Sequence, residues 1–157
     1  MGLPSRIVYA VSGGADGTLW AGTAAGVARI GTDGIKTFSV ENGALPHRWV
    51  TALLADEGGS YVGTYQGGVT RLDASGATPI HGTEALWLNP HGIERLGDRL
   101  YAASMGDGLV AFESGQAAGS KPVLRLGPLP STDVTAVKTF AGALWVGTRA
   151  GLARLPQ

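Results

Sequence analysis

Two histidines are the residues of this sequence best placed to do chemistry. His47 and His91 each stand just before a short apolar run, where an imidazole could act as a general base. A metal site would need further ligands at a matched spacing, and the sequence has no His-x-His, His-x-x-x-His or paired carboxylate motif. His81 stands apart, and there is no cysteine. We therefore expect no metal and no cofactor.

The carboxylates and glycine-rich stretches show no catalytic or phosphate-binding motif. Asp16, Asp33 and Asp98 each lie beside or near a glycine, as is usual in tight turns. No Asp-x-Asp-x-Asp-Gly calcium loop, phosphate-binding loop or nucleophile elbow is present. These residues favour a protein that is not an enzyme.

The residues with chemical potential are set in a repeat of about 42 residues. An aromatic residue followed by small residues recurs at steps of 41, 40 and 44, at Trp20, Tyr61, Tyr101 and Trp145. A proline recurs at steps of 42, 44 and 40, at Pro4, Pro46, Pro90 and Pro130. Two markers in phase predict four tandem units.

Each unit has the same internal order. After the proline come a short apolar run, a tight turn, the aromatic strand, a glycine-bearing turn, a third run and a more polar fourth stretch. In the second unit Val50, Ala52 and Leu54 should face one way and Leu53 the other, so both faces are apolar. This arrangement is typical of a β-propeller blade.

The predicted fold is all-β: a β-propeller of four tandem four-stranded antiparallel blades, the last of which lacks its outer strand. The single domain, residues 1–157, divides into blades of approximately 3–42, 43–86, 87–126 and 127–157. The 26 glycines exceed the usual share of about 7% and suit many tight turns. The recurring aromatic should fill the gap between blades.

An open arc of four blades would leave two apolar sheet faces in water. Three solutions are open: a closed small ring, two copies pairing as a homodimer into an eight-bladed ring, or continuation in a longer propeller protein.

Three units closely match a known pattern in "LWAGTAAGVARI", "YVGTYQGGVTRL" and "LWVGTRAGLARL", and "GLP", "GALP" and "GPLP" precede inner strands. The chain thereby resembles the two-component regulator propeller repeat family. The third unit departs from it, with Ala103-Ser104 in place of Gly-Thr and the charged pair Glu94-Arg95 in its inner strand. The resemblance implies a sensing region of a bacterial signalling receptor and a periplasmic or extracellular place. The N-terminus itself shows no signal peptide pattern.

The loops between blades and between second and third strands should converge on one face of a propeller. They hold the least repetitive residues of the chain. These candidate ligand-binding residues are His47, Arg48, Trp49, Tyr65, Gln66, Trp87, Asn89, His91, Met105, Asp107 and Arg149. Aromatic, amide and charged groups together suit a sugar, a peptide or a partner protein. The structural alternative is that Trp49 and Trp87 pack beneath their loops.

Arg95 is a further ligand-binding candidate. A charge pair in an inner strand is costly between two blades unless each charge finds a partner or water. Glu94 and Arg95 should therefore face a wet central channel or a loosened edge, or Arg95 should select a ligand in that channel.

The predicted function is non-enzymatic recognition of a ligand or protein. One alternative is a small propeller lyase or hydrolase that uses a loop histidine, and another is a scaffold held by blade pairing. Twelve basic and twelve acidic residues exclude a strong field for nucleic acid. No run of about 18 apolar residues would insert into a membrane. The expected partner is a small molecule such as a carbohydrate, or a protein.

Overall fold

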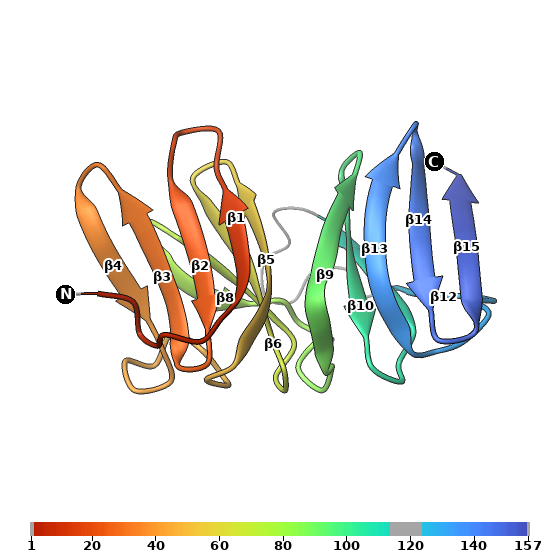
Figure 1. Cartoon of the computed structure of the whole chain (residues 1–157), viewed down its shortest axis with the longest axis horizontal. Helices are drawn as coiled ribbons and strands as arrows, with labels where there is room; N and C mark the ends of the chain where they lie inside the picture. The colour runs from red at the N-terminus through yellow and green to blue at the C-terminus, as the bar shows by residue number, and fades with distance from the viewer. Residues whose placement is uncertain (1, 114–123, 157) are drawn as a thin grey trace.

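A computed structural model describes residues 2–113 and 124–156. They form four antiparallel sheets placed side by side in an arc (Figure 1). The first sheet contains β1 (Val8–Gly13), β2 (Leu19–Thr23), β3 (Gly26–Gly31) and β4 (Gly34–Phe38). The second contains β5 (Val50–Asp56), β6 (Gly59–Thr64), β7 (Val69–Asp73) and β8 (Gly76–Pro79). The third contains β9 (Leu88–Leu96), β10 (Arg99–Ser104), β11 (Leu109–Glu113) and β12 (Leu124–Leu126). The fourth contains β13 (Val134–Phe140), β14 (Ala143–Thr148) and β15 (Gly151–Pro156).

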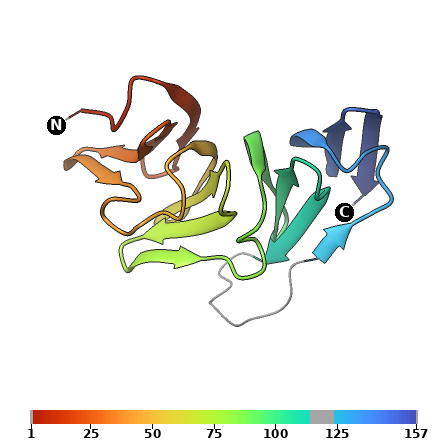
Figure 2. The same ribbon diagram turned by 90° about the horizontal axis from the view of Figure 1, so that it is seen from below.

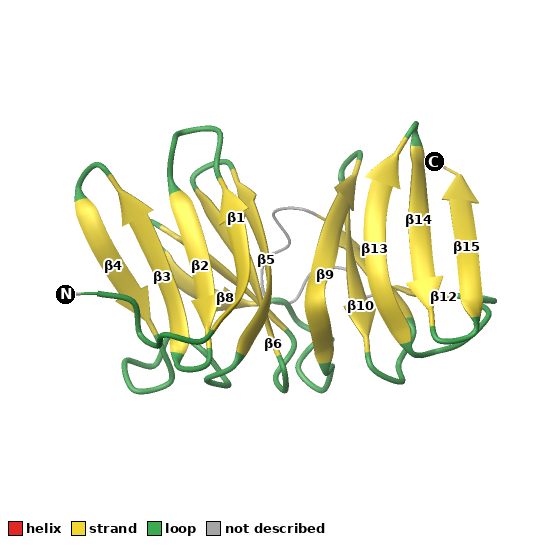
Figure 3. Ribbon diagram, in the orientation of Figure 1, coloured by secondary structure: helices red, strands yellow, loops and turns green. Residues whose placement is uncertain are grey.

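Each sheet is a meander in which every strand pairs with the next one in the chain. Figure 3 shows this alternation of strand and turn along the described residues. The innermost strands β1, β5, β9 and β13 follow one another along the arc. The predicted fold class is confirmed: the sheets are four propeller blades, and the fourth has three strands. Among the described residues no helix is long and apolar enough to cross a membrane.

The core lies between neighbouring blades rather than within one. Trp20 and Tyr61 are buried in the clusters between blades one and two and between blades two and three. Gly22 sits beside Trp20, and a Cβ at this position would lie 2.6 Å from Cγ1 of Val50. The recurring aromatic therefore fills the gap between blades, and the small residue near it allows their close approach.

A β-bulge lies at the start of every inner strand. In blade two the register between β5 and β6 shifts between Val50 and Ala52. Val50 and Leu53 consequently pack toward blade one, whereas Ala52 and Leu54 pack toward blade three. The prediction that Val50 faces the same way as Ala52 was wrong, because simple alternation ignores the extra residue of a bulge.

The bulges aim polar side chains across the blade interfaces. Thr51 is buried and its Oγ1 donates a hydrogen bond to the backbone oxygen of Leu88, 2.9 Å away. In the same way Nδ2 of buried Asn89 donates to the backbone oxygen of Val134. We call such a bond, from the second residue of one inner strand to the first residue of the next, a blade staple. It joins the inner strands of two neighbouring blades, which belong to different sheets and are not paired with each other.

The chain is an open arc, not a closed ring. Figure 2 places the first and last blades at opposite ends, with the N-terminal and C-terminal sheets apart. Large apolar side chains are exposed at both ends: Val11 is 59% exposed, Phe140 69% and Leu152 64%. Of the predicted solutions, self-closure into a four-bladed ring is not the one this chain adopts.

Candidate functional site

One backbone hydrogen bond recurs in all four blades and builds one face of the arc. In each blade, the first residue of the turn between the second and third strands donates its backbone N–H to a carbonyl oxygen. That oxygen belongs to the residue just before the inner strand. The four pairs, with N to O distances of 3.0, 2.9, 2.8 and 3.1 Å, are Ala24 and Ile7, Tyr65 and Trp49, Met105 and Trp87, and Arg149 and Asp133. We call this end the loop face. It is the lower end in Figure 1, where the inner strands begin, and Figure 2 views it directly.

Four aromatic rings meet on the loop face, over blades two and three. Tyr65 is central: its ring centroid lies 5.4 Å from that of Trp49, 5.3 Å from that of Trp87 and 6.2 Å from that of His47. We call these four residues the aromatic cluster. Trp49 is 41% exposed and Trp87 42%. The alternative in which both tryptophans pack beneath their loops therefore does not hold.

The local sequence fixes the cluster in place. Trp49 and Trp87 each stand directly before an inner strand, and their carbonyls accept the recurring hydrogen bond. The backbone N–H of Trp49 also donates to Nδ1 of His47, 3.1 Å away, which sets the two rings edge to face. The turn between β6 and β7 then brings Tyr65 between the tryptophans.

Polar groups surround the cluster. Arg48 lies 3.3 Å from Oε1 of Glu41, and both side chains are exposed. Hydrogen bonds from its own backbone and from the Ser39 hydroxyl hold the pKa of Glu41 below its ordinary value, with Arg48 contributing charge attraction. Gln66 is exposed in the turn after Tyr65. An apolar surface with charged and amide groups beside it can hold a flat ligand and hydrogen bond its edge.

Three other predicted site residues are used elsewhere, and a fourth, Met105, lies next to the cluster. Asn89 is buried in a blade staple, so its prediction as a ligand residue was wrong. Arg149 pairs with Asp133 on blade four. Asp107 pairs with Arg125, at 2.7 Å, toward the outside of blade three. Met105 is half-buried beside Trp87.

His91 is not equivalent to His47, contrary to the prediction. It lies inside β9, in the bulge, with a φ of 55°, and its side chain is exposed. His47 lies in the loop before β5. Within residues 2–113 and 124–156, neither histidine makes a hydrogen bond to another side chain, and no group of three His, Asp or Glu side chains could hold a metal.

Arg95 also lies away from the loop face, near the other end of β9. Its Nη2 is 2.7 Å from Oδ2 of Asp56 in blade two, as an ion pair without hydrogen-bond geometry. Glu94 reaches the other way, and its Oε2 accepts a hydrogen bond from Nζ of Lys138 in blade four. The two charges are therefore paired with neighbouring blades, as a charge pair in an inner strand requires, and the channel-ligand role of Arg95 stays a prediction.

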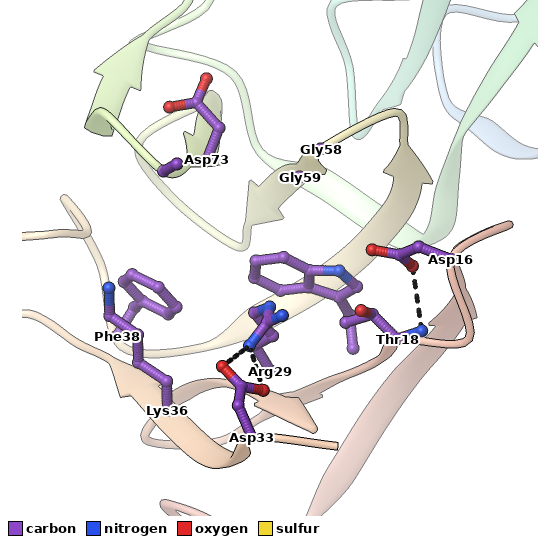
Figure 4. A pocket seen from close by; sticks show the side chains of 11 residues that line it. Asp16, Thr18, Arg29, Asp33, Lys36, Phe38, Gly58, Gly59 and Asp73 are labelled. Carbon is purple, nitrogen blue, oxygen red and sulfur yellow. Dashed lines mark hydrogen bonds and ion pairs between the residues drawn. The ribbon is translucent and has the colours of Figure 1, made fainter. Parts of the chain in front are cut away.

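A hollow of about 420 Å³ lies between blades one and two at the end opposite the loop face. Figure 4 shows Arg29 paired with Asp33, at 2.9 Å, and Asp16 accepting a hydrogen bond from the Thr18 backbone. These partners hold the pKa of both carboxyls below the ordinary value. The carboxyl groups of Asp16 and Asp33 are therefore already satisfied by near neighbours, and Nζ of Lys36 lies over the Phe38 ring, 5.1 Å from its centroid. Sequence reasoning missed the hollow, since turn residues of two blades meet only in the folded arc.

Comparison with known proteins identifies the fold and no family. No protein-family model and no curated protein matches the sequence. Among solved structures, the chain is similar to the computationally designed protein Ika4, with a TM-score of 0.67, 15% identity and coverage of 99% of this chain and 96% of that one.

Two further similar structures are larger. Streptogramin B lyase matches with a TM-score of 0.67 and 17% identity over 100% of this chain and 57% of that one. The extracellular domain of the two-component system protein BT4673 from B. thetaiotaomicron matches with a TM-score of 0.54 and 15% identity, over 96% of this chain and 27% of that one. At these identities the similarity is one of fold: the chain is built of β-propeller blades like these proteins.

Proposed function

We propose that this protein is a non-enzymatic recognition module that binds its ligand on the aromatic cluster of the loop face. The observation that carries the proposal is the exposure of Trp49 and Trp87 on either side of Tyr65. Large aromatic rings are costly to leave in water, and grouped ones are typical of binding surfaces. The repeat resemblance and the fold shared with a two-component extracellular domain support a sensing role.

A carbohydrate suits this surface best. The apolar face of a sugar ring can stack on Trp49 or Trp87, while Arg48 and Gln66 offer hydrogen-bond partners to its hydroxyls. A partner protein would need about 800 Å² of its surface buried, much more than four side chains supply.

The test is a titration with oligosaccharides of defined composition, followed by tryptophan fluorescence. Binding should change the emission of the exposed tryptophans. Trp49→Ala and Trp87→Ala should each weaken binding at least tenfold, whereas Leu124→Ala, at an exposed leucine on the outer edge of blade three, should not. Binding that survives the double variant Trp49→Ala/Trp87→Ala, or a panel in which only peptides bind, would contradict the proposal.

The second candidate is a lyase, favoured by the similarity to streptogramin B lyase and by His47 beside the cluster. Against it, a general base is usually held by a second side chain, and the polar contact of His47 is to a backbone N–H. Incubation with streptogramin B, with chromatography of the products, separates the two. We expect no turnover; turnover abolished by His47→Ala would establish the lyase instead.

A further inference from the structure

The two end faces of the arc both expose large apolar side chains, and the face on blade four also carries Lys138 and Arg154 beside Trp145. Blade four exposes the face that carries Trp145, Gly147, Leu152 and Phe140, and we call it the trailing face. Blade one exposes the face that carries Val11, Leu19, Ala21, Ala28, Ile30 and Ile35, which we call the leading face.

The trailing face repeats a surface that is already buried elsewhere in the molecule. In blade one, Trp20 pairs with Arg29, and Gly22 pairs with Val27, on the face that packs on blade two. In blade four, Trp145 pairs with Arg154 and Gly147 with Leu152 at the same register positions. The trailing face of blade four thus has the same kinds of residue, at the same positions, as the face of blade one that packs on blade two.

The leading face repeats the surface that receives such a blade. In blade two, Leu53, Val62 and Leu72 pack on blade one and are at most 6% exposed. The residues of blade one at these register positions are Val11, Ala21 and Ile30. Val11 is nevertheless 59% exposed, and Leu19 and Ile35 are each 42% exposed. The six side chains that define the leading face are all uncharged, so packing another blade on them buries no charge of their own.

An unused blade staple lies at the same junction. Thr51 and Asn89, the second residues of β5 and β9, donate to the first residue of the next inner strand. Thr135 is the second residue of β13 and is exposed, with no hydrogen bond from its side chain among the described residues. The first residue of β1, Val8, holds the acceptor position and is 42% exposed.

We infer that two copies of this chain join head to tail, the trailing face of each packing on the leading face of the other, to close an eight-bladed ring. Thr135 of each copy would donate to the carbonyl of Val8 in its partner. That two copies make one ring is supported by the similarity to the WD40 β-propeller domain of Doa1, of which one arc covers 50%, with a TM-score of 0.67 and 17% identity. A head-to-tail contact of this kind closes a ring when its rotation brings the last copy back to the first, as two half-ring arcs would do, and otherwise builds an open filament.

The ring would display two aromatic clusters on one side. Head-to-tail closure turns the second copy about the propeller axis and leaves its loop face pointing the same way. If the cluster binds as proposed, one ring offers two sites, and a ligand that spans both gains avidity without new contacts. This consequence depends on the proposed function, whereas the pairing does not.

The experiment is a measurement of mass in solution by light scattering, without ligand, for the 157-residue chain and three variants. Leu19→Asp places a charge on the leading face and Leu152→Asp on the trailing face. Leu124→Asp is the matched control, since Leu124 is an exposed leucine on the outer edge of blade three. We expect twice 16.0 kDa for the parent and the control, and 16.0 kDa for each of the other two.

Each other outcome overturns the inference. A parent mass of 16.0 kDa excludes pairing, and a mass that grows beyond two copies with concentration excludes closure. Loss of pairing in Leu19→Asp but not in Leu152→Asp would indicate a symmetric contact through blade one. Circular dichroism checks that each variant is folded; if one is not, Val11→Asp or Phe140→Asp replaces it on the same face.

Discussion

Ala141 holds a backbone conformation that alanine seldom adopts. It lies in the tight turn between β13 and β14 with a φ of 48°, and Gly142 follows with a φ of 71°. Asparagine tolerates this left-handed region better, and Asn-Gly is the preferred pair for such a turn. Ala141→Asn should therefore stabilise the protein by about 0.5–1 kcal/mol, measured by urea unfolding.

The matched control is Ala150→Asn, in the turn between β14 and β15, where φ is not positive. This variant should change the stability by less than about 0.5 kcal/mol. A loss of stability in Ala141→Asn, or an equal gain in both variants, would show that the turn is not strained.

Asp73 is a surface carboxylate whose pKa is lowered. The Ser75 hydroxyl, 2.6 Å away, is the main cause, and the Ser75 backbone N–H, at 2.8 Å, adds to it. Because the folded pKa lies below the ordinary 3.8, the stabilisation is complete above 3.8 and is lost as the pH falls through the folded value. Ser75→Ala should raise the pKa of Asp73, as measured by NMR titration of the carboxyl carbon. Ser5→Ala, in another blade, should leave it unchanged.

At the residue scale, sequence reasoning located the aromatic cluster and its polar neighbours Arg48 and Gln66, but grouped with them other polar residues that lie elsewhere. Trp49, Tyr65 and Trp87 could be placed on one face because their positions in the repeat fix which end of a blade they occupy. Asn89 and Arg95 could not, because their partners, Val134 and Asp56, belong to neighbouring blades. A contact between blades depends on the register of two sheets, and one strand's pattern does not encode it.

Among the elements, the blade staple at Asn89 should carry much of the coupling between blades three and four. Asn89→Ala would leave the backbone oxygen of Val134 without this buried hydrogen bond. A buried group left unsatisfied costs about 1–3 kcal/mol, so we expect a loss of that size in urea unfolding. Gln66→Ala removes an exposed amide and is the control, with little expected change. A loss below about 0.5 kcal/mol for Asn89→Ala would assign the coupling to the apolar core instead.

The order of the elements was predictable and their local irregularity was not. Four strands per unit followed from the spacing of turns and apolar runs, and the described sheets have this order. The bulge at the start of each inner strand escaped notice because one extra residue does not change the composition of the strand. It does reverse the face of the sheet on which residues before it, such as Val50 and His91, lie. Its recurrence in all four blades shows that it belongs to the repeat.

At the scale of the whole molecule, an arc with two apolar ends should be more stable when those ends are covered. If two copies close a ring, unfolding must also separate them, so the melting temperature should rise with protein concentration. A tenfold increase favours the pair by about 1.4 kcal/mol, or about 0.7 kcal/mol per chain, and should raise the melting temperature by about 2 °C. Scanning calorimetry over a hundredfold range of protein concentration would measure this.

The control is Leu19→Asp, which should remain a monomer of 16.0 kDa. It should melt at a lower temperature that does not depend on concentration, because its unfolding separates no partner. If the melting temperature of Leu19→Asp still depends on concentration, the chains associate through a surface other than the leading face. If the melting temperature of the parent does not depend on concentration, the arc is stable with both ends in water.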